Sequence, residues 1–343
     1  MDKLKVSRYL IVFLTSFVAL VIGTDLAAQS TKRGIITGGA LHTAPDWFKE
    51  SFLEIQEDVD EASKANKHVM LFFQLNGCSY CDRMLTESFE SEPVSSYNQQ
   101  HFDVIAINVK GYREIAFNEE ITGLEKELSE IVKVRGTPAI LFLDSQNRSI
   151  LRADGYRAPE RFQKILEYVS SRSYQRVSLV DYLNKSSKQV VYQLRQNTLF
   201  KPITDLSKVK GPLAVIFEDT SCYDCDEFHD RLLSNEDVIA ELNAFTLVRL
   251  DTNSRITIID TQGNKTTASE LARQFNLSYR PGVLIFDQGN LVKRYDSLLY
   301  KFHFREGLRY ISSGAYKTED RRSYSQRRRE ELLLSGVNID LSR

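Results

Sequence analysis

The four cysteines of the 343-residue chain form two pairs with the spacing Cys-x-x-Cys, Cys78/Cys81 and Cys222/Cys225. Two thiols at this spacing can close a short disulfide and exchange it with a disulfide of another molecule, because a thiolate attacks disulfide sulfur. The same spacing also occurs in zinc sites and can form a purely structural bridge. The residues around each pair distinguish these three uses.

Zinc binding and structural bridging both fit the pairs poorly. A zinc site built from two such pairs places them roughly 15–20 residues apart, whereas these pairs lie in distant parts of the chain. His229 follows Cys225 at a distance suited to a ligand, but Leu85 holds the equivalent position after the first pair. A structural bridge this short removes little chain entropy. We favour redox exchange, with thiol-based metal handling as a weaker alternative.

Each pair is preceded by an apolar run and followed by residues that predict a helix. Residues 69–73 and 213–217 are short apolar segments typical of buried strands. The predicted helices place Cys78 and Cys222 at a helix N-terminus, where the helix dipole and free N–H groups stabilise a thiolate. We therefore expect the first cysteine of each pair to attack a partner disulfide and the second to resolve the mixed disulfide.

The elements around the two pairs repeat along the chain. The matching segments are strands at 102–108 and 245–251, amphipathic helices at 128–134 and 271–277, strands after a proline at 139–144 and 282–287, and closing helices near 159–171 and 302–312. Asn147 and Gly289-Asn290 mark hairpin turns. A strand–helix half joined to a hairpin half predicts an α/β fold, with a mixed central sheet flanked by helices in each copy.

This repeat predicts the domain organisation. The predicted segments are an export signal at 1–28, an N-terminal segment at 29–44, a first domain at 45–175, a partly helical linker at 176–210, a second domain at 211–316 and a charged tail at 317–343. The arginines of the tail could form a basic patch for a membrane surface or an acidic partner. Because acids are interleaved with them, we favour a solvated helix whose Leu332–Leu334 pack on the second domain.

The predicted export signal begins with basic residues and continues in an apolar run over residues 9–23. That run is shorter than the roughly 20 residues that a membrane-spanning helix needs, and Ala27-Ala28 offers a cleavage site. We expect a periplasmic protein, with anchoring to the inner membrane by an uncleaved segment as the alternative. Membrane contact is expected only in that second case. Export would place the cysteine pairs in an oxidising compartment, where disulfides form and persist.

The composition excludes several classes of function. The 45 basic and 46 acidic residues leave a formal charge of -1, which argues against a strongly basic nucleic-acid binder and against an acidic solvating chain. The sequence contains no glycine-rich phosphate loop and no Ser/His/Asp hydrolase signature. We therefore expect no nucleic-acid partner and no cofactor, and we expect the cysteines to carry the chemistry.

A buried strand, a Cys-x-x-Cys helix and a proline about 60 residues later resemble the thioredoxin superfamily. As a tandem, the chain is similar to exported thioredoxin-related proteins of the SoxW type. The resemblance implies that Pro138 and Pro281 are cis and face the cysteine pairs. It also implies that Thr137 and Arg280, the residues before these prolines, offer backbone hydrogen bonds to a substrate.

Two tyrosines lie inside the cysteine pairs, Tyr80 in the first and Tyr223 in the second. They could bind a partner through an apolar rim, or they could be ordinary loop residues. The sequence also departs from thioredoxins, which carry a Trp before the pair and a buried Asp six residues before its first cysteine. Phe72 and Ile216 occupy the buried position here, so we expect inefficient proton transfer to the resolving cysteine.

The residues between the cysteines indicate the redox character of the sites. Neither pair encloses a His that would stabilise the reduced form, and the negative charge of Asp224 disfavours a nearby thiolate. We expect neither site to be a strong oxidant. The hypothesis is an exported protein-disulfide reductase or isomerase that acts on disulfide-bearing exported proteins and receives electrons from a membrane thiol donor. The alternative is a redox-sensitive chaperone or assembly factor.

Overall fold

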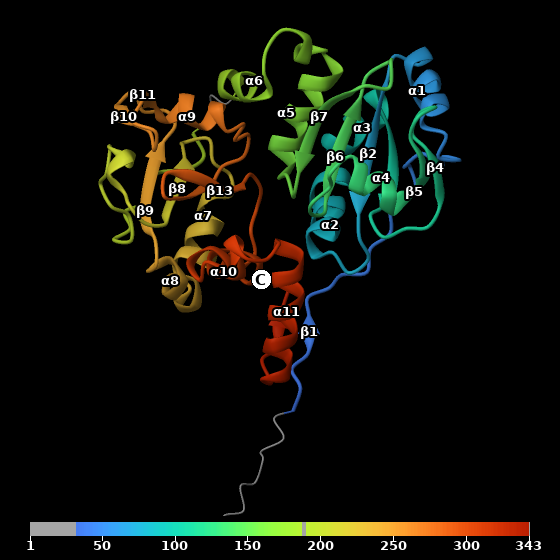
Figure 1. Ribbon diagram of the computed structural model, residues 1–343. Coiled ribbons are helices and arrows are strands. Elements are labelled where there is room, and N and C mark those ends of the chain that lie inside the picture. Colours follow the sequence, from blue (N-terminus) through green and yellow to red (C-terminus); the bar gives the residue numbers. More distant parts are fainter. Residues whose placement is uncertain (1–31, 187–189, 343) are drawn as a thin grey trace, which may run out of the picture.

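The computed structural model describes residues 32–186 and 190–342, and in it two α/β domains lie side by side (Figure 1). The predicted export signal at 1–28 lies outside the described residues. Each domain is built on a four-stranded sheet, with the order β3-β2-β6-β7 in the first and β13-β12-β8-β9 in the second. Among the helices described, every one is too short or too polar to cross a membrane.

The first domain alternates strands and helices in the predicted order. Its elements are α1 (Ile55–Lys64), β2 (His68–Gln74), α2 (Ser79–Met84), the π-helix η1 (Leu85–Phe89), α3 (Val94–His101), β3 (Phe102–Asn108), β4 (Glu114–Ala116), β5 (Thr122–Leu124), α4 (Glu125–Ile131), β6 (Ala139–Leu143), β7 (Ser149–Asp154) and α5 (Pro159–Ser170). β2 pairs parallel with β3 and antiparallel with β6, and β7 returns antiparallel beside β6. The sheet is therefore mixed, as predicted.

The second domain repeats this arrangement. Its elements are β8 (Leu213–Glu218), α7 (Cys225–Phe228), the π-helix η4 (His229–Leu233), α8 (Glu236–Leu242), β9 (Thr246–Asp251), β10 (Thr257–Ile259), β11 (Lys265–Thr267), α9 (Ala268–Gln274), β12 (Gly282–Asp287), β13 (Asn290–Tyr295) and α10 (Lys301–Ser312). Here β8 takes the place of β2, parallel to β9 and antiparallel to β12. Both domains thus bring a cysteine pair to the end of a central strand.

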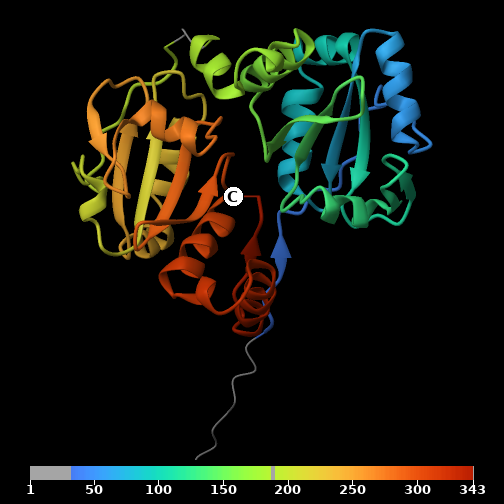
Figure 2. The ribbon, with the colours of Figure 1, turned by 45° about the horizontal axis from the view of Figure 1, so that its top comes forward.

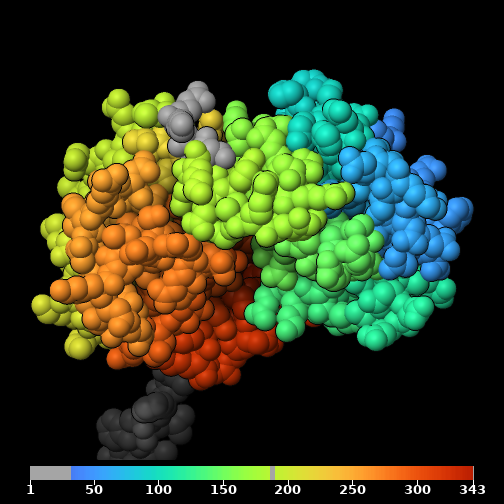
Figure 3. Space-filling model, turned by 90° about the horizontal axis from the view of Figure 1, so that it is seen from above, coloured from blue at the N-terminus to red at the C-terminus, as the bar shows by residue number. Residues whose placement is uncertain are grey.

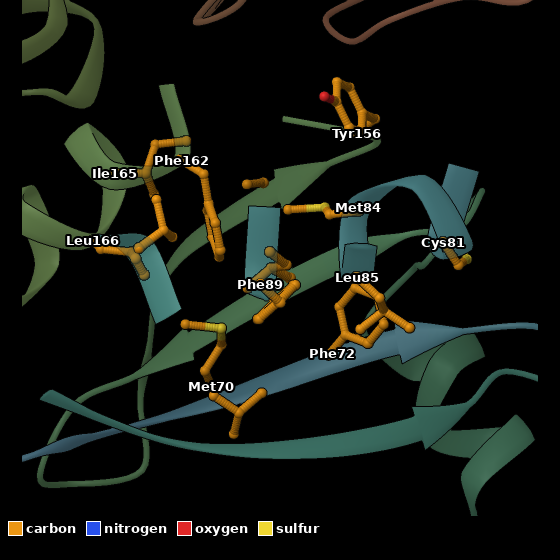
Figure 4. Packing of buried hydrophobic residues seen from close by; sticks show 14 of the residues in the cluster. Met70, Phe72, Cys81, Met84, Leu85, Phe89, Tyr156, Phe162, Ile165 and Leu166 are labelled. Carbon is orange, nitrogen blue, oxygen red and sulfur yellow. The ribbon is translucent and has the colours of Figure 1, made fainter. Parts of the chain in front are cut away.

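The central strand of each sheet is apolar along its whole length because both of its faces are covered. In β2, Met70 and Phe72 face the cluster that includes α2 and α5, whereas Leu71 and Phe73 face the cluster with α1 and α4. Figure 4 shows Phe72 and Phe89 in the cluster that covers one face of the sheet, with Cys81 at its edge. This alternation is the ordinary geometry of a strand, and it fixes the direction in which the cysteine pair leaves the sheet.

The segment between the domains contains α6 (Leu179–Ser186) and two short 3-10 turns, η2 (Ser173–Gln175) and η3 (Leu206–Lys208). In the space-filling view its yellow-green atoms lie across the junction of the two domains (Figure 3). One of its residues, Tyr192, is buried against the second cysteine pair. The segment therefore contributes to a site as well as connecting the domains.

The ends of the described chain lie together. Strand β1 (Ile36–Thr37) pairs parallel with β14 (Ile339–Asp340), beside helix α11 (Arg321–Leu334), as Figures 1 and 2 show. The turn η5 (Ala315–Lys317) leads into that helix. Leu332 and Leu333 are buried with Phe302 of the second domain, as predicted. Leu334 is 59% exposed, so its predicted burial is wrong. It points away because consecutive helical residues diverge by about 100°.

Candidate active sites

Both cysteine pairs are closed as disulfides. The Cα atoms of Cys78 and Cys81 are 5.2 Å apart, and those of Cys222 and Cys225 are 5.5 Å apart. Each disulfide follows the central strand of its sheet, so the two bonds occupy equivalent positions in the two domains. The described residues hold no group of three or more His, Cys, Asp or Glu side chains placed to bind a metal ion.

The first pair begins a helix, as predicted. Cys78 is the N-cap of α2, and its Sγ accepts a hydrogen bond from the backbone N–H of Cys81 at 3.1 Å. The backbone oxygen of Cys78 also accepts from Asp82 at 3.1 Å, which is a helical hydrogen bond. The sulfur of Cys78 thus lies at the positive end of the helix, where a thiolate is stabilised.

For the second pair, the prediction that a helix begins at its first cysteine is wrong. Helix α7 begins at Cys225 with Asp224 as its N-cap, so Cys222 lies in the preceding turn. The physical reason is the carboxylate of Asp224, which accepts a hydrogen bond from the hydroxyl of buried Tyr279. With Asp224 held in this way, the first helical bond of α7 runs from Phe228 N–H to Asp224 O. Cys222 therefore lacks the helix N-terminal position of Cys78.

A cis proline follows each site, as the resemblance implies. The peptide bonds Thr137-Pro138 and Arg280-Pro281 are both cis. In the first domain the hydroxyl of Thr137 donates to Cys78 Sγ at 3.3 Å, so the proline loop faces the disulfide. A hydroxyl that donates to sulfur favours the charged form of that sulfur after reduction.

Arg280, the residue equivalent to Thr137, points into its own domain. Its Nε donates to the carboxylate of Asp219 at 2.9 Å, and its Nη1 donates to the backbone oxygen of Tyr279 at 2.9 Å. The Asp219 backbone oxygen in turn accepts from Cys222 N–H at 3.1 Å. Both charged side chains are buried, and the cation of Arg280 helps to lower the pKa of the Asp219 carboxyl against the opposing effect of burial. Arg280 therefore positions the loop before Cys222.

A buried polar network beside the second disulfide was missed by the sequence analysis. Glu218 is fully buried, and its Oε1 lies 2.8 Å from His229 Nε2. Its Oε2 accepts from the hydroxyl of Tyr192 at 3.1 Å, and the ring of Tyr192 packs against Cys222 and Cys225. Burial, followed by the charge of Glu218, raises the pKa of Tyr192 to about 12. We call Tyr192, Glu218 and His229 the second-site network.

The signal for this network was present in the strand pattern. Ile216 and Glu218 are two residues apart in β8, so they share the face that is covered by the cysteine helix. A buried carboxylate therefore does lie on this face, two residues beyond the position held by Ile216. The first domain has Gln74 in place of Glu218 and Leu85 in place of His229, and Gln74 Oε1 lies 2.9 Å from His42 Nε2.

Asp224 is the other ionisable group close to the second pair. Burial raises its pKa to about 6, although the hydrogen bond from Tyr279 opposes the change. The carboxylate is therefore charged at neutral pH and takes up a proton in mildly acidic solution. Tyr223, its neighbour, has an exposed ring.

The two cysteine helices contact each other across the domain junction. Arg83 of α2 donates two hydrogen bonds to the carboxylate of Glu227 of α7, at 3.1 and 3.0 Å. These residues hold equivalent positions in the repeat, five residues after the first cysteine of each pair. Tyr80 stacks on Tyr300 of the second domain with ring centroids 4.0 Å apart, and burial raises its pKa. The tyrosine of the first pair thus packs within the molecule.

Segments from elsewhere in the chain cover both disulfides. At the first site the hydroxyl of Ser79 donates to the backbone oxygen of Leu341 at 2.9 Å, and His42 contacts Gln74. We call residues 36–42 and 339–342, which hold these contacts, the terminal strap. Cys78 is 9% exposed, and Cys222, beneath Tyr192, is 1% exposed. Access to either sulfur in this arrangement requires movement of the covering segment.

Two mixed sheets, each with a Cys-x-x-Cys disulfide opposite a cis proline, are features of a tandem thiol–disulfide oxidoreductase of the thioredoxin fold. The comparison with protein families agrees with this class. The thioredoxin-like domain matches residues 55–170 and again residues 201–312, which together make up more than half of the chain. The chain belongs to the thioredoxin-like domain family.

Several solved structures are similar to a part of this chain that is about the size of one domain. A thioredoxin-fold protein from Helicobacter pylori is 26% identical with a TM-score of 0.32, over 40% of this chain and 92% of that chain. A thioredoxin from Thermus thermophilus is 26% identical with a TM-score of 0.28, over 34% of this chain and 83% of that chain. The oxidised C-terminal domain of DsbD from Neisseria meningitidis is 19% identical with a TM-score of 0.25, over 34% of this chain and 90% of that chain. The search of curated proteins finds no match.

Proposed function

We propose that this protein is an exported thiol–disulfide oxidoreductase that reduces or isomerises disulfides of other exported proteins, similar in role to SoxW-type proteins. The observation that carries the proposal is the first site. There a disulfide at a helix N-terminus faces a cis-proline loop, and the hydroxyl of Thr137 donates to Cys78 Sγ at 3.3 Å. Periplasmic location, or anchoring through an uncleaved N-terminal segment, is part of the proposal.

The reaction at the first site balances as a two-electron exchange. The thiolate of reduced Cys78 attacks one sulfur of a substrate disulfide, a mixed disulfide forms, and the other substrate sulfur leaves as a thiolate. Cys81, after losing its proton, attacks Cys78 Sγ and releases the second substrate thiolate. The substrate gains two electrons and takes up two protons, while Cys78 and Cys81 return to the disulfide. In isomerisation a substrate thiolate attacks the mixed disulfide instead and restores reduced Cys78.

The second site would follow the same sequence with Cys222 and Cys225. The second-site network supports a role in moving the proton of Cys225, because Glu218 is a buried carboxylate that is linked through Tyr192 to the cysteine pair. Since either site ends as a disulfide after reducing a substrate, an external dithiol must reduce it again. We propose a membrane thiol donor for that step.

Turnover of protein disulfides tests the proposal. The full mature chain is supplied with a dithiol reductant and assayed for insulin reduction and for repair of a scrambled disulfide protein. Cys78→Ser and Cys222→Ser should each remove the turnover of one site, and the double variant should have none. Cys81→Ser and Cys225→Ser should accumulate a mixed disulfide with the substrate. Wild-type turnover in the double variant would refute the proposal.

A second candidate function is a redox-sensitive binding module, such as a chaperone or assembly factor. The burial of both nucleophiles favours it, because Cys78 and Cys222 are covered by parts of the same chain. In this case reduction would loosen the covering segments and change partner binding. Redox-dependent capture of unfolded proteins by a chain that turns over no disulfide would support this alternative. N-terminal sequencing of protein from cell fractions tests export separately.

A further inference from the structure

A groove lies between the two domains, next to the first cysteine pair. It has a volume of about 490 Å³ and is lined by Tyr80, Arg135 and Thr137 of the first domain and by residues 291–299 and His303 of the second. Figure 3 shows the molecule hollowed between these domains. Thr137, which lines the groove, donates a hydrogen bond to Cys78 Sγ at 3.3 Å, so the groove lies one residue away from the reacting sulfur. A substrate bound at the first site would extend into it.

The cations of the groove fall into two groups. Arg152 is paired with Asp154 at 3.0 Å, and Arg294 donates to the backbone oxygen of Asn276 at 2.6 Å. Within the described ranges, by contrast, Arg135 and Lys293 have no carboxylate within 4.0 Å. The ammonium of Lys293 lies 5.3 Å from the centre of the Tyr295 ring instead. Two positive charges therefore face the groove without a negative partner.

The negative groups of the groove are already engaged. Asp154 is bound by Arg152, and Asp296 accepts from the backbone N–H groups of Ser278 and Tyr279 at 2.7 Å each. Asp296 also lies 3.5 Å from Arg157. Asp154 attracts Lys293 from beyond 4.0 Å, but neither carboxylate is in direct contact with Arg135 or Lys293. A ligand that brings its own carboxylates would neutralise these two cations, since ion pairs in a partly buried groove are weakly screened.

Lys293 is unfavourably placed in the absence of such a ligand. Burial lowers the pKa of its ammonium, and the charges of Arg321, Arg135 and Arg294 lower it further against the smaller opposing effect of Asp154. His303, at the end of the groove, has a buried Nδ1 atom without a hydrogen-bond partner. The groove therefore offers positive charge and a free polar atom close to the reacting sulfur.

The second site lacks this arrangement. In the repeat, Ser278 holds the position of Arg135, and Leu151, which pairs with Phe142 as Lys293 pairs with Ile285, holds the position of Lys293. Arg280, in the position of Thr137, is turned inward to Asp219. The unpaired charges are thus a property of the first site alone.

We propose that the groove selects substrates, or substrate segments, that carry Asp or Glu next to the disulfide reduced at the first site. This inference rests on the proposed function. Arg135 and Lys293 contact the substrate carboxylates while Thr137 lies at the disulfide. The selectivity is expressed mainly in KM, because the carboxylates bind away from the reacting sulfurs.

Matched disulfide peptides test the inference. Two peptides are identical except for three Glu or three Gln residues beside the disulfide, and both are assayed with the Cys222→Ser/Cys225→Ser chain. The Glu peptide should have a kcat/KM about tenfold higher at low salt, with the difference reduced in high salt. Arg135→Gln and Lys293→Gln should each diminish the preference, and the double variant should abolish it. Arg322→Gln on α11 is the matched control and should retain it.

The outcomes separate this inference from the proposed function. Equal kcat/KM for the two peptides would overturn the inference and leave the oxidoreductase intact. If neither peptide nor a neutral small disulfide is turned over, the proposed function fails instead. The inference is still tested in that case by fluorescence anisotropy with peptides in which Ser replaces Cys. Tighter binding of the Glu peptide supports it, and equal binding overturns it. Arg135→Glu, at an exposed position, should reverse the preference without a loss of thermal stability.

Discussion

Uncharged side chains, Gln74, Leu85 and Thr137, surround the first cysteine pair, whereas Glu218, His229 and Arg280 hold the equivalent positions around the second. The strand order of the sheet and the cis proline before β6 or β12 are the same in both domains. The difference shows that the apolar sheet positions a disulfide whatever polar groups lie beside it. Protonation can therefore be adjusted at one site without changing the scaffold. The first site has the groove and the second has the buried ionisable network.

The largest expected effect comes from giving the second site the proline-loop residue of the first. Arg280→Thr leaves the buried Asp219 carboxylate without its cation, which should destabilise the second domain by about 3–5 kcal/mol. Urea unfolding of the full chain measures the loss. Arg273→Thr, which removes a half-exposed arginine that forms a long surface pair with Asp181 at 3.9 Å, is the control and should cost less than about 1 kcal/mol. Equal effects of the two changes would contradict the assigned role of Arg280.

A pH effect is expected from Asp224. Its pKa is raised in the folded protein to about 6, so the folded state binds this proton more tightly than the unfolded state does. The proton on Asp224 contributes about 3 kcal/mol to the free energy of unfolding at a pH below the ordinary pKa of Asp. This contribution decreases as the pH rises and is lost above about pH 6. Asp224→Asn should remove this slope.

The measurement is the difference in unfolding free energy between wild type and Asp224→Asn from pH 3.5 to 7.5. The difference is needed because burial lowers the pKa of both His68 and His303 to about 4. Those histidines make stability rise with pH in much of the same window. Asp226→Asn, at an exposed neighbouring carboxylate, is the matched control and should leave the slope unchanged. A flat difference for Asp224→Asn would refute the assignment.

A smaller effect is expected from converting the second-site network to its first-site equivalent. His229→Leu leaves buried Glu218 with the Tyr192 hydroxyl and with Arg249, whose Nη1 is 3.9 Å away, at a cost of about 1–3 kcal/mol. The double variant Glu218→Gln/His229→Leu reproduces the pair Gln74 and Leu85, so it should be more stable than the two separate losses predict. A double-mutant cycle by urea unfolding measures this coupling. Strict additivity would show that the two side chains do not act together.

The smallest effect is expected at Thr137. Thr137→Val removes the hydroxyl that donates to Cys78 Sγ and keeps the shape of the side chain. Because the hydroxyl favours a reduced, charged sulfur, its loss should shift the equilibrium with glutathione towards the disulfide by about fivefold or less. The second disulfide, titrated in the same sample, is the internal control. A shift of both disulfides would point to a global change rather than to this hydrogen bond.

The elements that the sequence predicts well are those with a strong local pattern. The apolar runs of β2 and β8, the helix at Cys78 and the hairpin turns all follow from residues that are adjacent in the chain. The resemblance to the thioredoxin superfamily implied the cis state of Pro138 and Pro281. Burial on both faces leaves little choice of residue in a central strand, which is why these predictions succeed.

The parts that could not be predicted depend on contacts between distant segments. Glu218 ends a strand, a position that is usually solvated, and its burial depends on Tyr192, His229 and the nearby cation of Arg249. Cys222 precedes its helix because Tyr279, far along the chain, holds Asp224. The pairing of β1 with β14 joins two-residue strands, and segments this short carry no periodic signal.

The terminal strap has a consequence for the order in which the molecule is completed. Its halves come from opposite ends of the described chain, and a chain is synthesised from the N-terminus. The first domain can therefore fold while residues 339–342 have yet to be made. During that interval Ser79 lacks its contact with Leu341, and the first cysteine pair lacks this half of its cover. Residues that are synthesised late thus cover an active site that is synthesised early.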